Sequence, residues 1–352
     1  MELYRMLTMN IRHTIYTICQ SIKTMAIGSL LCLAVQSCRQ ETHPLIPEDP
    51  EEVPISMNAT SVEAMETSRA LVDSDVALQN NELGLGVYGY KLFNGTKTLV
   101  FDNERVYYSS GWKYDNTKYW DKAATEYRFV AYSPHSTSNI RYNTNNHTLT
   151  ISNIPYWQVI NGSEVDYLVA TSSGSADHYL TEQQASTAVN FTFSHILSQL
   201  VINIKKDEKL SQTYLLKQVE YLNVPQGGDA KATYTLSQEG TATMSDIILL
   251  GDDATLTQFT DANGQTVTTS NIPLSHLVVP FTLTDDKQVQ VKVTYTVEGT
   301  PRAKTVDTGI TQLDAGKRYE LTLTFKGAEI VPSLEIKKWE DVTVDEDPKY
   351  NW

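Results

Sequence analysis

The sequence predicts an all-β protein built from antiparallel β-sandwiches. Apolar and polar residues alternate along the segments 200–205, 289–297 and 319–325, so each segment has one apolar and one polar face. A period of two residues is typical of strands that cover a core on one side and meet water on the other. Clusters of Gly, Asn, Asp and Pro separate many such segments, and long helical patterns are scarce. These observations together favour β-sandwiches.

The first 37 residues have the pattern of an export signal. Three basic residues precede an apolar run at 25–35, which is too short to span a hydrocarbon core that needs about 20 residues. Because Cys38 follows this run, we interpret residues 1–37 as a bacterial lipoprotein signal peptide and Cys38 as the lipidated residue. An ordinary signal peptide cleaved ahead of a free cysteine is the alternative, since residues 35–37 match the usual lipoprotein pattern only loosely.

Cysteine usage agrees with lipidation at Cys38. The other two cysteines, Cys19 and Cys32, lie inside the leader, so Cys38 alone remains after processing. One cysteine forms neither a disulfide framework nor a thiolate metal cluster. Several acyl chains on it, palmitate among them, would hold the protein firmly in the outer membrane at the cell surface. No later stretch is apolar enough to predict a transmembrane helix.

Charge and motifs exclude several classes of function. The chain carries a formal charge of −14, and its leader is net positive, so the exported part is more acidic still. We therefore expect no nucleic-acid partner. The sequence has no metal-binding histidine spacing, no Gly-x-Ser-x-Gly and no phosphate-binding glycine loop. We predict no catalytic residue, no metal, no cofactor and no enzyme, and we interpret His195 as a hydrogen-bonded strand residue.

Changes in composition divide the chain into segments. Residues 38–54 are rich in proline and acid and are predicted to be a flexible tether. Alternation at 55–59 is a weak signal of a first strand. A stretch rich in serine and glycine at 172–186 predicts a domain joint, giving an N-terminal sandwich at 55–186 and a C-terminal one at 187–352. Whether the apolar segment that follows closes the first sandwich or opens the second stays open.

Three motifs and a final tryptophan resemble those of the fimbrillin-type lipoproteins, which are subunits of type V pili. Tyr127–Pro134 resembles the family's Phe-x-Ala-Tyr-x-Pro strand, and Phe193–Leu200 resembles its Phe-x-His-x-Leu-x-x-Leu stretch. Leu313–Tyr319 resembles a late Leu-x-x-Gly-x-x-Tyr turn and strand, and Trp339 follows the strand-like Leu334–Lys338. The order of these motifs behind a lipoprotein signal is the basis of the resemblance.

The resemblance implies a fold, a function and a set of partners. The fold would be two transthyretin-like β-sandwiches in tandem, and the function that of a structural subunit of a cell-surface fimbria supporting adhesion. Its partners would be other copies of itself or related fimbrial subunits, the outer membrane through Cys38, a surface protease, and host or bacterial surface ligands.

The resemblance also implies a route of assembly. The protease would cut between Arg69 and Ala70 and release the lipid, the tether and the first strand. A C-terminal segment of another subunit would replace that strand, and Val342 and Val344, which alternate with polar residues, are the candidate donors. Without the resemblance, Arg69 would be interpreted as an exposed loop arginine.

Other roles stay open beside the shaft subunit. The chain fits a pilus anchor that keeps its lipid, or a tip adhesin. It also fits an outer-surface lipoprotein that does not polymerise and binds glycans on Trp112, Trp120 and Trp157, although tryptophans of a β-core more often serve packing. A glycoside-active enzyme with paired carboxylates ranks last.

Overall fold

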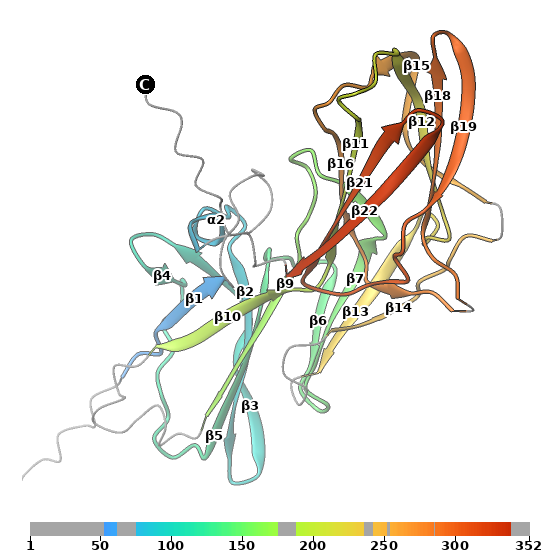
Figure 1. The fold of residues 1–352 in the computed structure, drawn as a ribbon. Helices are drawn as coiled ribbons and strands as arrows, with labels where there is room; N and C mark the ends of the chain where they lie inside the picture. Colours follow the sequence, from blue (N-terminus) through green and yellow to red (C-terminus); the bar gives the residue numbers. More distant parts are fainter. Residues whose placement is uncertain are drawn as a thin grey trace, which may run out of the picture. The chain divides into compact units, whose positions relative to one another are not determined.

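Strands make up nearly all of the regular structure of the protein, as the sequence predicts (Figure 1). The computed structural model describes residues 53–61, 75–174, 188–235, 242–251, 254–284 and 286–338. Within these ranges the one α-helix is α2 (Asp75–Gln79). No helix among the described residues is long and apolar enough to cross a membrane. The all-β sandwich prediction is confirmed.

A seven-stranded sheet contains the first described strand, β1, at one edge. In Figure 1, β1 (blue) lies beside β10 (yellow-green), with which it pairs in parallel. The other pairs in this sheet are antiparallel. The strands follow one another across the sheet in the order β1 (Met57–Ser61), β10 (Val189–His195), β9 (Leu168–Gly174), β5 (Glu126–Ser133), β2 (Leu85–Phe93), β3 (Thr96–Tyr108) and β4 (Trp112–Lys113).

A four-stranded sheet shares a core with the seven-stranded one. Tyr88 and Val130 of the larger sheet pack in one buried cluster with Leu149, Ile151 and Ala232 of the smaller. The smaller sheet joins strands from both sides of residue 186, where the sequence predicts a domain joint; that boundary stays a prediction. Its order is β14 (Ala242–Ser245), β13 (Asp229–Thr235), β7 (Thr148–Pro155) and β6 (Ile140–Asn143).

Two further sheets enclose the C-terminal core. One has the order β22 (Glu329–Lys338), β21 (Lys317–Lys326), β11 (Ser198–Lys206), β16 (Ile272–Val278) and β8 (Trp157–Val159). The other has the order β15 (Leu256–Thr266), β12 (Tyr214–Leu222), β18 (Gln290–Val297) and β19 (Thr300–Asp307). A short pair, β17 (Phe281–Thr282) and β20 (Gln312–Leu313), accompanies them.

The three segments with the clearest alternation are β11, β18 and β21, and their apolar faces meet in this core. Ile202, Val293 and Leu321 are fully buried members of one cluster. Because each large apolar side chain contributes about 1.5–3 kcal/mol on burial, such faces bind the two sheets together. The polar residues between them stay half-exposed on β18 and β21.

The segment at 193–200 answers the question that the sequence leaves open. β10 ends at His195 and belongs to the seven-stranded sheet, whereas β11 begins at Ser198 and belongs to the five-stranded one. Ile196 and Leu197 join the two strands and are both buried. The segment therefore contributes to both sheets.

Candidate functional site

The residues that the sequence singles out for processing and assembly lie outside the described residues. These are Cys38, Arg69, Ala70, Val342 and Val344. The strand that a cut after Arg69 would release is described, however, together with two segments that contact it, residues 112–120 and β10. The candidate functional site is therefore β1 with the residues that precede it, 53–61, and the groove in which it lies.

One flank of β1 pairs with β10. The register runs from Met57 opposite Val189 to Ser61 opposite Phe193, with both strands in the same direction. Just before the strand, the N–H of Val189 donates to the carbonyl of Ser56 at 2.9 Å. On this flank, β1 is thus held by the backbone hydrogen bonds that any strand makes with its neighbour in a sheet.

The other flank meets a segment that lies far along the chain, residues 112–120. The N–H of Ile55 donates to the carbonyl of Lys118 at 2.8 Å, and the N–H of Trp120 donates to the carbonyl of Val53 at 2.9 Å. Between these bonds, residues 54 and 119 form an isolated antiparallel bridge. Backbone bonds therefore hold the start of residues 53–61 on the side away from β10.

Two side chains of the same segment extend this contact along residues 55–59. The hydroxyl of Tyr114 donates to the carbonyl of Ile55 at 2.6 Å, and the indole N–H of Trp112 donates to the carbonyl of Ala59 at 3.2 Å. Burial raises the pKa of Tyr114, which keeps its hydroxyl protonated and able to donate. We call residues 112–120 the clamp. β1 lies between β10 and the clamp.

Apolar side chains of 53–61 fill a groove between these flanks. Ile55, Met57 and Ala59 are 1%, 7% and 4% exposed, whereas the intervening Ser56 and Asn58 are exposed. This alternation is the weak first-strand signal in the sequence, and it is confirmed. The three side chains share a buried cluster whose other members include Leu78, Trp120, Phe191 and Phe193.

The tryptophans considered as a glycan platform serve the packing of the protein. Trp120 is buried and meets the ring of Tyr127 edge-on, with ring centroids 4.7 Å apart. Trp112 and Trp157 are half-buried, and each donates its ring N–H to a backbone carbonyl. Trp120 belongs to the core cluster around β1, and Trp112 and Trp157 pack against the cores as partly buried residues, which favours the packing interpretation.

His195 is a buried, paired residue, as the sequence predicts. Its Nδ1 lies 3.0 Å from Asp166, and the two side chains are 3% and 1% exposed. His195 borders a cavity of about 750 Å³ that is also lined by Phe281, Lys317 and Lys338. Among the described residues, no group of three or more histidine, cysteine or acidic side chains is placed to hold a metal ion.

Comparison with known proteins identifies the family. A family model described as fimbrillin-like matches residues 68–339. Among solved structures, a fimbrial protein from Bacteroides vulgatus is similar at 16% identity and a TM-score of 0.49, over 81% of this chain and 99% of that one. The tip fimbrial protein Mfa3 from Porphyromonas gingivalis, with a C-terminal truncation, is similar at 10% identity and a TM-score of 0.42, over 82% and 100%.

A fimbrial assembly protein from Parabacteroides distasonis is similar at 12% identity and a TM-score of 0.38, over 82% of this chain and 99% of that one. No curated protein matches the chain. The family match covers most of the chain and confirms the resemblance seen in its motifs. Proteins of this family are structural and adhesive components of cell-surface fimbriae, not enzymes. This chain belongs to the fimbrillin-like family.

Proposed function

We propose that this protein is a shaft subunit that polymerises by strand exchange after a protease removes its first strand. In this proposal it is exported as a lipoprotein acylated on Cys38 and is cut between Arg69 and Ala70. The observation that supports the proposal most directly is the place of β1: it is a sheet edge strand, yet it is bonded on both flanks and fills an apolar groove.

Loss of residues 53–61 would leave a site of high free energy. Each backbone hydrogen bond contributes about 1 kcal/mol net, and each large apolar side chain about 1.5–3 kcal/mol. The groove would expose Phe191 and Phe193, and unpaired backbone groups would face it from both β10 and the clamp. Such an edge is a template for another strand. Addition of a strand from a neighbouring subunit would restore the sheet.

The C-terminal tail has the pattern that this groove requires. Side chains that enter the groove from β1 are two residues apart, as Met57 and Ala59 are. Val342 and Val344 have the same spacing, with Asp341, Thr343 and Asp345 between and beyond them. A strand of this pattern would place two apolar side chains in the groove and its polar residues in water. Val342 and Val344 are therefore the proposed donors.

An anchor subunit that keeps its lipid and β1 is the second candidate. The clamp favours it, because Trp112 bonds to Ala59 of β1 and Tyr114 bonds to Ile55 just before it, and an ordinary edge strand lacks such bonds on its outer flank. The strand would then stay in place, and Cys38 would hold the base of a fimbria in the outer membrane. A glycan-binding lipoprotein receives less support, because the tryptophans serve packing.

The test is intact mass and N-terminal sequencing of the protein from the native cell surface, before and after an arginine-specific protease. A new terminus at Ala70, with SDS-resistant ladders, is the expected result for a shaft subunit. Arg69→Ala should abolish both the cut and the ladder, while the matched variant Arg302→Ala, at an exposed strand position, should change neither. Acylated Cys38 with no cut and no ladder would overturn the shaft role in favour of an anchor.

A further inference from the structure

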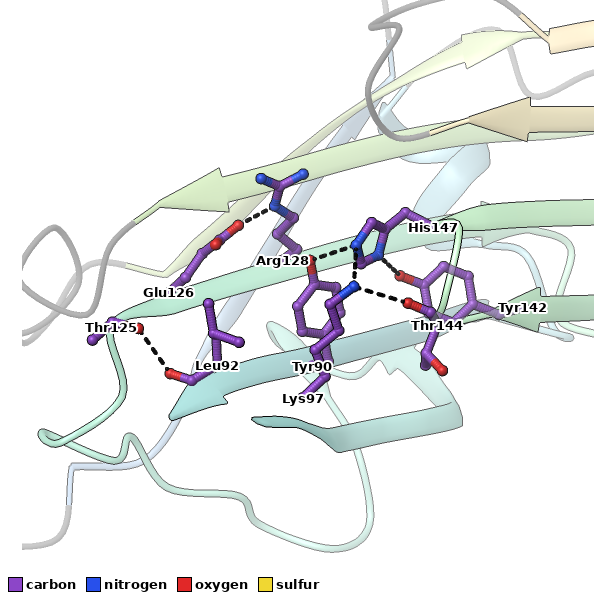
Figure 2. Close-up of polar contacts among 9 residues, drawn as sticks. All are labelled: Tyr90, Leu92, Lys97, Thr125, Glu126, Arg128, Tyr142, Thr144 and His147. Atoms are coloured by element: carbon purple, nitrogen blue, oxygen red, sulfur yellow. Dashed lines mark hydrogen bonds and ion pairs between the residues drawn. The ribbon is translucent and has the colours of Figure 1, made fainter. Parts of the chain in front are cut away.

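His147 joins two sheets at a point far from β1. It lies in the turn at 144–147 between β6 and β7, and its ring meets the β2–β3 hairpin of the seven-stranded sheet (Figure 2). Its Nε2 lies 2.8 Å from Nζ of Lys97 and 3.2 Å from the hydroxyl of Tyr90. Its Nδ1 lies 3.4 Å from the hydroxyl of Tyr142.

The chemistry of these neighbours determines the protonation state of His147. An ammonium group donates hydrogen bonds and accepts none, so the nitrogen 2.8 Å from Lys97 must be the acceptor. Nε2 therefore carries no proton, and the ring is neutral, with its proton on Nδ1. From there it points to the Tyr142 hydroxyl, which accepts. This arrangement exists only while His147 is uncharged.

Packing against Tyr90 holds the His147 ring in hydrogen-bonding distance of Lys97. The rings of His147 and Tyr90 stack, with centroids 4.8 Å apart and planes 15° from parallel. Nζ of Lys97 lies 5.6 Å from the centroid of the Tyr90 ring and also donates to the carbonyl of Thr144 at 3.4 Å. Lys97, from β3, thus bonds to two residues of the turn between β6 and β7.

Lys97 and Arg128 are positively charged neighbours of His147, and they disfavour protonation of its ring. Burial lowers the pKa of His147 most, and Lys97 on β3 and Arg128 on β5 lower it further. Glu126 on β5 acts in the opposite direction, but it is paired with Arg128. Burial also raises the pKa of Tyr90 on β2 and of Tyr142 on β6, so both remain neutral hydroxyls.

We propose that Lys97, Tyr90 and His147 form a proton-operated latch between the β2–β3 hairpin and the β6–β7 turn. With His147 neutral, the latch is closed by the Lys97 ammonium donating to Nε2. Transfer of a proton from solvent to Nε2 replaces the acceptor by an N–H that faces the ammonium. The Lys97–His147 bond is then lost, like charges lie side by side, and the turn separates from the hairpin.

The direction of the pH dependence follows from linkage. In the open form the solvated ring has the ordinary histidine pKa of about 6.5, whereas in the closed form the pKa lies below that value. As the pH falls, the open form therefore binds the proton first. The closed latch is fully stable above about pH 7 and loses stability as the pH falls below about 6.5. The proposal does not depend on strand exchange.

Nitrogen NMR of the full chain labelled with [¹⁵N]histidine tests the protonation state. The His147 signals are assigned by their loss in His147→Asn, which suits the left-handed φ of 54° at this position. At pH 8 the expected form carries its proton on Nδ1, and its titration midpoint lies below 6.5. A proton on Nε2, or an ordinary midpoint, would overturn the proposal.

Amide hydrogen exchange tests the opening itself. After correction for intrinsic rates, residues 144–148 are expected to exchange several-fold faster at pH 5 than at pH 7.5 in the wild type. His147→Asn should remove this difference, because it has no titrating group. Lys97→Met should raise the His147 midpoint towards 6.5, because it removes the facing charge.

His135→Asn is the matched control. His135 is another half-buried histidine whose pKa is lowered, chiefly by burial, but it contacts Asn103 and not the turn. This variant should keep the pH dependence of exchange at 144–148. If it abolishes that dependence, or if His147→Asn leaves it unchanged, the turn responds to another group and the latch is wrong.

Discussion

Tyr114 donates its hydroxyl to the carbonyl of Ile55 at 2.6 Å, across 59 residues of chain. The bond joins the start of the first strand to the clamp and supplements the backbone pairing between residues 53–55 and 118–120. The clamp thus makes β1 more than an edge strand held on one side by β10. This contact contributes to how tightly residues 53–61 are held in the groove.

Tyr114→Phe is expected to destabilise the uncut protein by about 1–2 kcal/mol, because it removes the hydrogen bond that the hydroxyl donates to Ile55 and the one that it accepts from the N–H of Lys118, while the ring stays. Urea unfolding of the uncut chain measures the change in the free energy of unfolding. The control is Tyr119→Phe, since Tyr119 is exposed and its bridge with residue 54 is made by the backbone, which the substitution keeps. Equal effects of the two variants would contradict a specific role of the Tyr114 hydroxyl.

Ile55→Ala is expected to destabilise the uncut protein by about 2–5 kcal/mol, because it leaves a cavity in the groove. After cleavage at Arg69 the same variant should be as stable as the cut wild type, since residue 55 has then left. Thermal or urea unfolding of both forms makes the comparison. Val76→Ala, at an apolar but 63% exposed position, should change neither form. A loss that persists after cleavage would mean that the first strand stays bound.

His276 makes the stability of the C-terminal core depend on pH. It is 1% exposed, and burial lowers its pKa to about 4. In the unfolded chain its pKa is about 6.5, so the unfolded state binds the proton first as the pH falls. The contribution of neutral His276 is complete above about pH 7 and is lost between about pH 6.5 and 4, amounting to about 3 kcal/mol.

His276→Phe should therefore flatten the acid side of the stability curve. Urea unfolding between pH 7.5 and 4.5 measures this, and the difference between variant and wild type should grow as the pH falls. A constant difference across this range would show that His276 does not titrate on unfolding.

Tyr221→Phe is expected to leave stability unchanged or to raise it by up to about 1–3 kcal/mol. The Tyr221 hydroxyl is fully buried and has no protein hydrogen-bond partner among the described residues, and its ring meets those of Trp157 and His276. Removal of an unpaired buried hydroxyl removes its desolvation penalty while the ring packing stays. Urea unfolding at pH 7.5 measures the change. Destabilisation by more than 1 kcal/mol would indicate that the hydroxyl is bonded.

The local part of this fold could be predicted from the sequence, and the long-range part could not. β18 and β21 have one apolar face each, so their alternation shows directly. The chain passes from one sheet to another at 195–198, but the sequence does not indicate this. Ile196 and Leu197, which connect the two strands, are apolar and buried like the strand residues around them. A pattern along one strand carries no information about which strand lies beside it.

In the candidate site, too, the local features could be predicted from the sequence and the long-range contacts could not. Alternation at 55–59 indicates a strand, and the resemblance to fimbrillins indicates its release. The clamp could not be predicted, since Trp112 and Tyr114 contact β1 across more than fifty residues of chain. The contacts of His147 could not be predicted for the same reason: Tyr90 and Lys97 lie 57 and 50 residues before His147, and the three side chains meet only when two hairpins pack together.

The parallel pairing of β1 with β10 has a consequence for the geometry of an assembly. A strand that replaced β1 in the same direction would give every subunit one donor and one acceptor, on different surfaces. Such a contact is head-to-tail, and it has no twofold axis that could close it into a dimer. Repetition of the contact would produce an open filament with two chemically different ends, one with an empty groove and one with an unused donor. The two ends would therefore add subunits in different ways, one by receiving a donor strand into its groove and the other by inserting its own donor strand.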